Sequence, residues 1–255
     1  MHKKKKCTLL FLFLGSTFIT IAQNQEKKNV LDNIQNKIDS CFLVSFSQDS
    51  VYEPIENALR EGIVKSKSDN LRYYHSYWFS YLLYYKSITY IKNGNEKKAK
   101  ETIAFAIKEL EKIKNKDVEV YSLLALEQSY NFQFVPRQEI IIYMGYINDN
   151  LEKAIQMNPE NVRANYVNGS YDFYTPKEYG GGRKTESFLL KAIQSEDTEH
   201  LYSPTWGKVD AYRLLIQYYL TNDSKEKAKK FFIEAQRLFP DNNMIKQLQK
   251  QIDNI

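Results

Sequence analysis

The sequence predicts an all-α protein built as an α-solenoid, a row of stacked antiparallel helix pairs. Apolar residues recur at helical spacing along most of the 255-residue chain. Large side chains are abundant, with 20 Tyr and 14 Phe, whereas helix breakers are few, with 9 Gly and 6 Pro. Two distant segments also share one pattern of alanines and aromatic residues, and such self-similarity is typical of repeat proteins.

The first 22 residues have the layout of an export signal. Four lysines precede an apolar run over 7–21, and Thr20 and Ala22 place small residues where a signal peptidase reads them. The run is shorter than the roughly 20 apolar residues that a membrane-spanning helix needs. We therefore expect cleavage near Ala22, a mature chain that starts at Gln23, no stable membrane span after cleavage, and a periplasmic or secreted protein. A retained signal anchor is the alternative.

The positive charge of the chain belongs mainly to this leader. Residues 1–22 hold four lysines and no acidic residue, so their removal lowers the formal net charge from +5 to about +1. A nearly neutral chain argues against nucleic acid as a partner. The mature chain keeps one cysteine, Cys41, and cannot form an internal disulfide, so its fold depends on packing alone.

In the first half of the mature chain, apolar stripes alternate with polar turns. The first stripe ends before the polar turn 48–50, and a shorter one ends before 66–70. A long aromatic-rich helix follows, and Gly94 suits the left-handed residue that ends it. The connection at 131–138 contains Pro136 and is longer than the usual turn between paired helices.

In the second half, prolines follow helix ends because proline cannot continue the hydrogen-bond ladder. Long connections are expected at 175–182 and 196–207, and the polar segment 241–255 is predicted to form a capping helix for the last pair. Residues 23–255 therefore form one domain of five helix pairs and a cap. The predicted helices span 29–44, 55–63, 71–91, 96–114, 118–130, 140–157, 161–174, 184–195, 208–221, 225–239 and 242–252.

The repeated pattern indicates how paired helices pack. Two alanines flank one large residue on the second helix, and tyrosines precede them on the first. Helices approach closely only where the crossing side chains are small, so the alanines are expected at the crossings. The repeat positions are Tyr90, Ala99, Ile103 and Ala106 in one copy, Ala154 and Pro159 in another, and Tyr212, Leu215, Tyr219, Ala228, Phe232, Ala235 and Pro240 in the last.

This pattern resembles the tetratricopeptide repeat (TPR) family. The best match is 212–240, while 90–106 and 147–159 match in part. Ser87 fits a position where the family prefers a small residue, whereas Ile216 departs from that preference. The resemblance covers more than half of the mature chain and implies an α-solenoid that binds proteins and carries out no catalysis.

Loop motifs between 158 and 207 resemble a narrower group, the exported TPR proteins of Bacteroidota-type bacteria. These motifs are Asn158-Pro159, Tyr174-Thr175-Pro176, Tyr179-Gly180-Gly181-Gly182 and Pro204-Thr205-Trp206-Gly207. A fainter resemblance is to the helical accessory components of solute transporters, which supply a groove or pore for small ligands.

Aromatic residues gather in two places. The stripe over 73–85 is wide enough to wrap around more than half of its helix, so most of it is expected in the core, and tyrosines left on the concave side would make contact points. The other place is the loop pair 175–182 and 196–207, which meet only if one loop folds back along the stack. These aromatics either bind a partner or pack against the adjoining pair: Tyr174, Tyr179, Tyr202 and Trp206.

Catalytic and cofactor motifs do not emerge from the sequence. Only His75 and His200 accompany Cys41 in the mature chain, which disfavours a zinc site. The glycine run 180–182 lacks the spacing of a phosphate-binding loop, because an arginine stands where a glycine is required. We therefore expect no metal and no cofactor.

The functional prediction is an exported, non-enzymatic scaffold that holds a protein or peptide partner in its concave groove. The alternative is a helical accessory module that binds a small ligand for a solute transporter. A third hypothesis is an enzyme on a helical scaffold, which two desolvated carboxylates with shifted pKa values would favour. The partner and the oligomeric state stay open.

Overall fold

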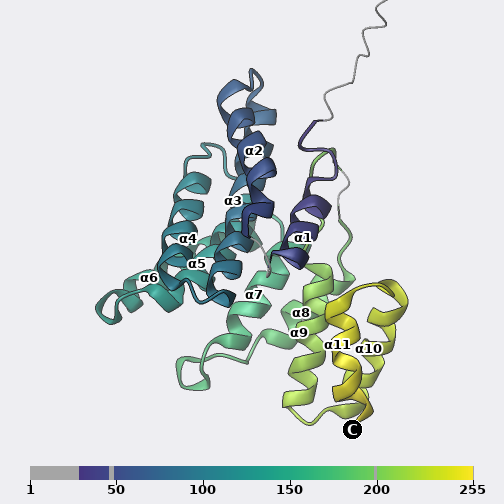
Figure 1. Ribbon diagram of the computed structural model, residues 1–255. Coiled ribbons are helices and arrows are strands. Elements are labelled where there is room, and N and C mark those ends of the chain that lie inside the picture. Colours follow the sequence, from purple (N-terminus) through teal and green to yellow (C-terminus); the bar gives the residue numbers. More distant parts are fainter. Residues whose placement is uncertain (1–28, 46–48, 198–199, 255) are drawn as a thin grey trace, which may run out of the picture.

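A computed structural model describes residues 29–45, 49–197 and 200–254, in which the chain forms eleven α-helices and no strand (Figure 1). The all-α prediction is confirmed, whereas the predicted leader lies outside the described residues. The elements are α1 (Ile34–Val44), η1 (Asp49–Tyr52), α2 (Glu53–Lys65), α3 (Asp69–Lys92), α4 (Glu96–Glu111), α5 (Val118–Asn131), η2 (Phe132–Phe134), η3 (Arg137–Glu139), α6 (Ile140–Met157), α7 (Val162–Tyr174), η4 (Lys177–Tyr179), α8 (Thr185–Gln194), α9 (Lys208–Thr221), α10 (Lys225–Leu238) and α11 (Asn243–Asp253).

Four pairs of consecutive helices pack as the repeat pattern predicts. They are α3 with α4, α5 with α6, α7 with α8, and α9 with α10. The first helices of these pairs, α3, α5, α7 and α9, also pack on one another in this order. We call the surface that these four helices share the inner face.

The N-terminal end differs from the predicted fifth pair. α1 packs mainly on α3 instead of α2, and α2 packs on α3 as well. The connection between α1 and α2 is itself anchored on α3, because Tyr52 is fully buried and its hydroxyl lies 3.1 Å from that of Thr89. α1 begins at Ile34 rather than at 29, since Asn33 has a left-handed φ of 50°. The prediction of five helix pairs is therefore wrong for the first pair, α1 with α2.

The alanines of the repeat lie where helices cross, as predicted. Ala99, Ala106, Ala228 and Ala235 are all 0 % exposed. On α3, the Ser87 hydroxyl donates to the carbonyl oxygen of Ala99 at 2.8 Å, so a hydrogen bond adds to the close contact with α4. Of the other repeat positions, Ile103, Ala154, Tyr212, Leu215, Tyr219 and Phe232 are buried and Tyr90 is half-buried. Pro159 and Pro240 lie beyond helix ends and are exposed.

α11 covers the end of the last pair. Its apolar residues Ile245, Leu248 and Ile252 are buried, and it packs on α10 and α9. Asn242 caps its N-terminus by accepting hydrogen bonds from two backbone N–H groups at 2.9 and 3.2 Å. Over the described ranges, every helix is too short or too polar to cross a bilayer.

Candidate binding face

The connection between α8 and α9 runs back along the inner face and reaches α1 (Figure 1). The Trp78 indole N–H donates to the carbonyl oxygen of Tyr202 at 2.9 Å. The Tyr202 hydroxyl accepts a hydrogen bond from Asn29 at 3.0 Å, and the backbone N–H of Thr205 donates to Gln35 at 2.9 Å. Residues 202–205 thus tie the C-terminal half of the chain to its first helices.

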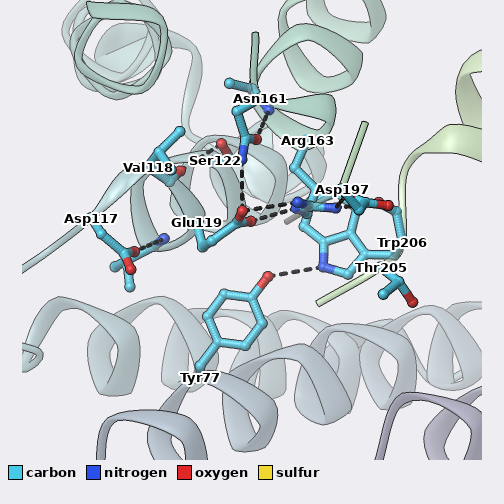
Figure 2. Close-up of polar contacts among 12 residues, drawn as sticks. Tyr77, Asp117, Val118, Glu119, Ser122, Asn161, Arg163, Asp197, Thr205 and Trp206 are labelled. Atoms are coloured by element: carbon cyan, nitrogen blue, oxygen red, sulfur yellow. Dashed lines mark hydrogen bonds and ion pairs between the residues drawn. The ribbon is translucent and has the colours of Figure 1, made fainter. Parts of the chain in front are cut away.

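Arg163 of α7 holds this connection in place. Its side chain is 2 % exposed and donates to both oxygens of Glu119 on α5 at 2.5 and 2.9 Å, and to Asp197 at 2.6 Å. Figure 2 shows the guanidinium between the two carboxylates and beside Trp206, whose carbonyl oxygen it reaches at 3.3 Å. Burial raises the pKa of Glu119 while the Arg163 charge opposes the shift. The three charges therefore depend on one another.

Trp206 anchors the connection in the core. Its indole N–H donates to the Tyr77 hydroxyl at 2.9 Å (Figure 2). Its ring stacks on Tyr81, with centroids 5.8 Å apart, and meets Tyr166 edge-on at 6.2 Å. Because Trp206 is only 6 % exposed, its ring forms part of the wall and is not open to a ligand.

Next to Trp206, the inner face carries tyrosines from three helices, and charged residues of α9 and α1 border them. Neighbouring rings touch, since the Tyr84 centroid lies 5.3 Å from that of Tyr85 and 5.4 Å from that of Tyr130. The Tyr81 hydroxyl donates to that of Tyr85 at 3.2 Å. We call this set the tyrosine face: Tyr81, Tyr84 and Tyr85 of α3, Tyr130 of α5, Tyr166 and Tyr174 of α7, Asp210 and Arg213 of α9, and Asp39 of α1.

The tyrosine face is desolvated but not closed. Surrounding atoms raise the pKa of Tyr84, Tyr85 and Tyr166, and the charge of Asp210 adds to the shift in all three. Yet Tyr84 and Tyr85 are only half-buried, and Tyr174 is 64 % exposed. The hydroxyls of Tyr84 and Tyr166 make no hydrogen bond to any other residue that the structure describes. Aromatic rings with free hydroxyls suit contact with a partner.

Three charged residues border these rings. Burial raises the pKa of Asp39 to about 6, and the nearby charge of Asp210 contributes. Burial also raises the pKa of Asp210, whose carboxylate interacts with the backbone N–H of Gly207 at the start of α9, the position of a capping carboxylate. The Arg213 guanidinium donates to Gln217 at 3.0 Å. In the described part of the chain, no group of three or more His, Cys, Asp or Glu residues could hold a metal ion.

Tyr179 lies away from the tyrosine face. With Gly180 and Gly181 it borders a pocket of about 580 Å³ between α6, α7 and α8. Gly181 permits the tight loop, since a Cβ there would stand 1.8 Å from the carbonyl oxygen of Thr175. The hydroxyl of Tyr171, in the wall of this pocket, is buried without a hydrogen-bond partner.

The four aromatics singled out from the sequence therefore do not share one surface. Tyr202 and Trp206 fix the connection, Tyr174 belongs to the tyrosine face, and Tyr179 lines the separate pocket. Sequence reasoning did not single out five members of the face. A signal was present, because tyrosines recur on α3, α5 and α7. The missed residues are Asp39, Tyr130, Tyr166, Asp210 and Arg213.

Two solved structures resemble this chain. The HusA haemophore from Porphyromonas gingivalis is 19 % identical with a TM-score of 0.55, covering 76 % of this chain and 94 % of that protein. A thermophilic TPR protein of Thermus thermophilus is 16 % identical with a TM-score of 0.53, covering 87 % and 99 %. These likenesses support a TPR-like helical fold. No protein-family model matches the chain. No curated protein sequence matches it either.

Proposed function

We propose that this chain is an exported, non-catalytic scaffold that holds a peptide segment of a partner protein on the tyrosine face. The observation that carries the proposal is the convergence of tyrosines from α3, α5 and α7 on one partly open surface, two of them with free hydroxyls. Tyrosine presents a large apolar ring with a polar tip, and it is enriched among the residues that dominate binding energy. The TPR-like fold supports the same interpretation.

Paired variants test this function. The full chain serves as bait in crosslinking capture from an envelope extract of the source organism, beside a Tyr84→Ser/Tyr174→Ser variant. The control is Tyr146→Ser/Tyr179→Ser, which changes two exposed tyrosines outside the face. A partner that the wild type and the control retain, and the face variant loses, supports the proposal. Equal capture by all three chains refutes it.

Export is the second part of the proposal, and it stands on the lysine-rich head and the apolar run over 7–21. N-terminal sequencing of the protein purified from the cell envelope is expected to begin at Gln23. A protein that retains Met1 in that fraction would indicate an uncleaved signal anchor instead.

A second candidate ligand is haem, which the haemophore neighbour suggests for this fold. Arg213 is the observation that favours it, because a half-buried guanidinium beside Tyr166 and Tyr174 suits a flat aromatic ligand that carries carboxylates. A haem titration followed by visible absorbance tests it. Saturable binding that Arg213→Gln weakens would support this ligand. The accessory module of a solute transporter has no comparable support.

A further inference from the structure

The cavity between α6, α7 and α8, which we call the α6–α8 pocket, has no role in the proposed function. Of the described residues, those that line it include no member of the tyrosine face. Its volume of about 580 Å³ is typical of small-molecule sites. α7 packs on both α6 and α8, and it contributes the residues that lie between them. The pocket is therefore a candidate site for a second, independent ligand.

Apolar side chains of two helices line this pocket. Leu151 and Ile155 lie one turn apart on α6, and Phe188 lies on α8. Leu151 is only 5 % exposed, and the other two are half-buried. Apolar and aromatic side chains on both sides suit the two faces of a flat ring. They do not suit a sugar, whose hydroxyl groups would lose their hydration against them.

Between these walls, α7 carries a hydroxyl group without a partner. Tyr171 lines the pocket, and its hydroxyl oxygen is buried without a hydrogen bond to any residue that the structure describes. Burial raises the pKa of Tyr171, so the hydroxyl keeps its proton and can donate. A desolvated hydroxyl left unpaired is unfavourable, and a ligand that supplies an acceptor would gain binding energy.

Asn168 precedes Tyr171 by one turn of α7 and also lines the pocket. Its amide nitrogen donates to the carbonyl oxygens of Ala164 at 2.9 Å and Leu151 at 3.4 Å. Both N–H groups are thus used, and the amide oxygen is left to accept from a ligand. Together, Asn168 and Tyr171 offer one acceptor and one donor from neighbouring positions of the same helix.

The charges around the pocket disfavour an anion. Among the described residues that line it, Lys184 is the only cation, and it is outnumbered by Glu152 and Asp172. Asp172 also accepts a hydrogen bond from the Lys184 backbone N–H at 2.9 Å and one from the Thr185 hydroxyl at 2.6 Å. Its carboxylate thus lies at the N-terminus of α8, where a phosphate would otherwise be favoured. An uncharged ligand fits this arrangement better.

We infer that the α6–α8 pocket binds an uncharged heteroaromatic ring of the nucleobase type, as the free base or the nucleoside. Such a ring has two apolar faces for the walls. On one edge it carries an N–H donor beside a ring nitrogen or carbonyl acceptor. The donor pairs with the Asn168 amide oxygen, and the acceptor pairs with the Tyr171 hydroxyl. Because the pocket shares no residue with the tyrosine face, this inference does not depend on the proposed function.

Isothermal titration calorimetry on the full chain tests the ligand. The probes are adenosine and uridine, each beside a twin that lacks the N–H donor on the ring edge: purine riboside for adenosine and 3-methyluridine for uridine. At least one nucleoside is expected to bind saturably, and about tenfold more tightly than its twin. The nucleoside 5′-monophosphates are expected to bind more weakly than the nucleosides, because the carboxylates repel the phosphate.

Two variants with the same chemical change locate the site. Tyr171→Phe removes the unpaired hydroxyl and is expected to weaken the nucleoside about tenfold. The same change should leave the urea midpoint of the free protein unchanged or raised, because no hydrogen bond is lost. Tyr146→Phe, on a tyrosine that is 57 % exposed and outside the pocket, is expected to alter neither measurement.

Four results would each overturn the inference. They are no binding of either nucleoside, equal binding of nucleoside and twin, tighter binding of the monophosphates, and wild-type affinity in Tyr171→Phe. Capture of a protein partner by the tyrosine face is measured separately, so none of these results decides the proposed function.

Discussion

Glu127 on α5 is a carboxyl group that folding buries completely. Burial raises its pKa to about 8, so the group is protonated in the folded protein at neutral pH. The contacts agree with this state. The Ser80 hydroxyl lies 2.7 Å from Glu127 Oε1 and 2.9 Å from the carbonyl oxygen of Ala106, but it carries one proton for two acceptors. A protonated Glu127 donates to Ser80, which then donates to Ala106.

This pKa sets a pH dependence of the free energy of unfolding. In the unfolded chain, Glu127 ionises with its ordinary pKa of 4.5, so between 4.5 and about 8 the folded state binds one proton more. Stability therefore falls as the pH rises through this window and is constant above it. A pKa difference of one between the folded and unfolded states corresponds to about 1.4 kcal/mol, so the total loss is about 3–5 kcal/mol.

The change Glu127→Gln removes the titrating group and keeps its shape. The amide still donates to Ser80, but its second N–H has no acceptor, so the variant is expected to be about 1–3 kcal/mol less stable at pH 5. At pH 8 it is expected to be the more stable protein, because the wild type has lost its proton-linked stability. The two stability curves should cross between these values.

Urea unfolding at pH 5, 6, 7 and 8, followed by circular dichroism, measures how the free energy of unfolding changes with pH in the variant and in the wild type. Glu101→Gln, on the exposed side of α4, is the matched control and should keep the slope of the wild type. Burial raises the pKa of Asp39 to about 6 and lowers the pKa of His75, so these groups add their own pH dependence to both proteins. The difference between Glu127→Gln and the wild type therefore isolates Glu127. A difference that does not vary with pH would refute the reasoning.

Three further predictions concern stability and are read from urea midpoints. Arg163→Met leaves Glu119 without its partner and is expected to destabilise the protein by about 3–5 kcal/mol; a loss under about 1 kcal/mol would mean that the network is dispensable. Ala235→Leu overfills a fully buried crossing and should cost about 1–3 kcal/mol, whereas an unchanged midpoint would count against the repeat register. Gly62→Ala places a Cβ 2.3 Å from the His75 ring and should cost a similar amount. Gly145→Ala meets open space on α6 and should stabilise the protein by about 0.5–1 kcal/mol. A Gly62→Ala protein more stable than Gly145→Ala would contradict this packing.

The helix pairs could be predicted because their signals are local. The spacing of Ala228, Phe232 and Ala235 falls within two turns of one helix, and the same spacing recurs in α4. α1 could not be placed in this way, because nothing in its own stripe tells whether α2 or α3 covers it. Its packing on α3 depends on contacts from the connection that follows it.

The candidate site could be predicted only in part. Apolar spacing assigned Tyr84 and Tyr85 to a packed stripe, whereas both side chains are half-buried. Arg163 looked like any charged helix residue, since its partner Glu119 lies 44 positions away. Such pairings leave no periodic trace in a single sequence.

A row of helix pairs in which each pair touches only its neighbours can lose its ends one pair at a time. The docking of residues 202–206 onto α1 and α3 limits this freedom at the N-terminal end, because it joins positions 124–173 apart in the chain. α1 cannot detach without breaking contacts to this connection, so hydrogen exchange should show α1 opening together with the connection rather than fraying alone. The same closure of long loops implies slow folding for an all-helical protein of this size.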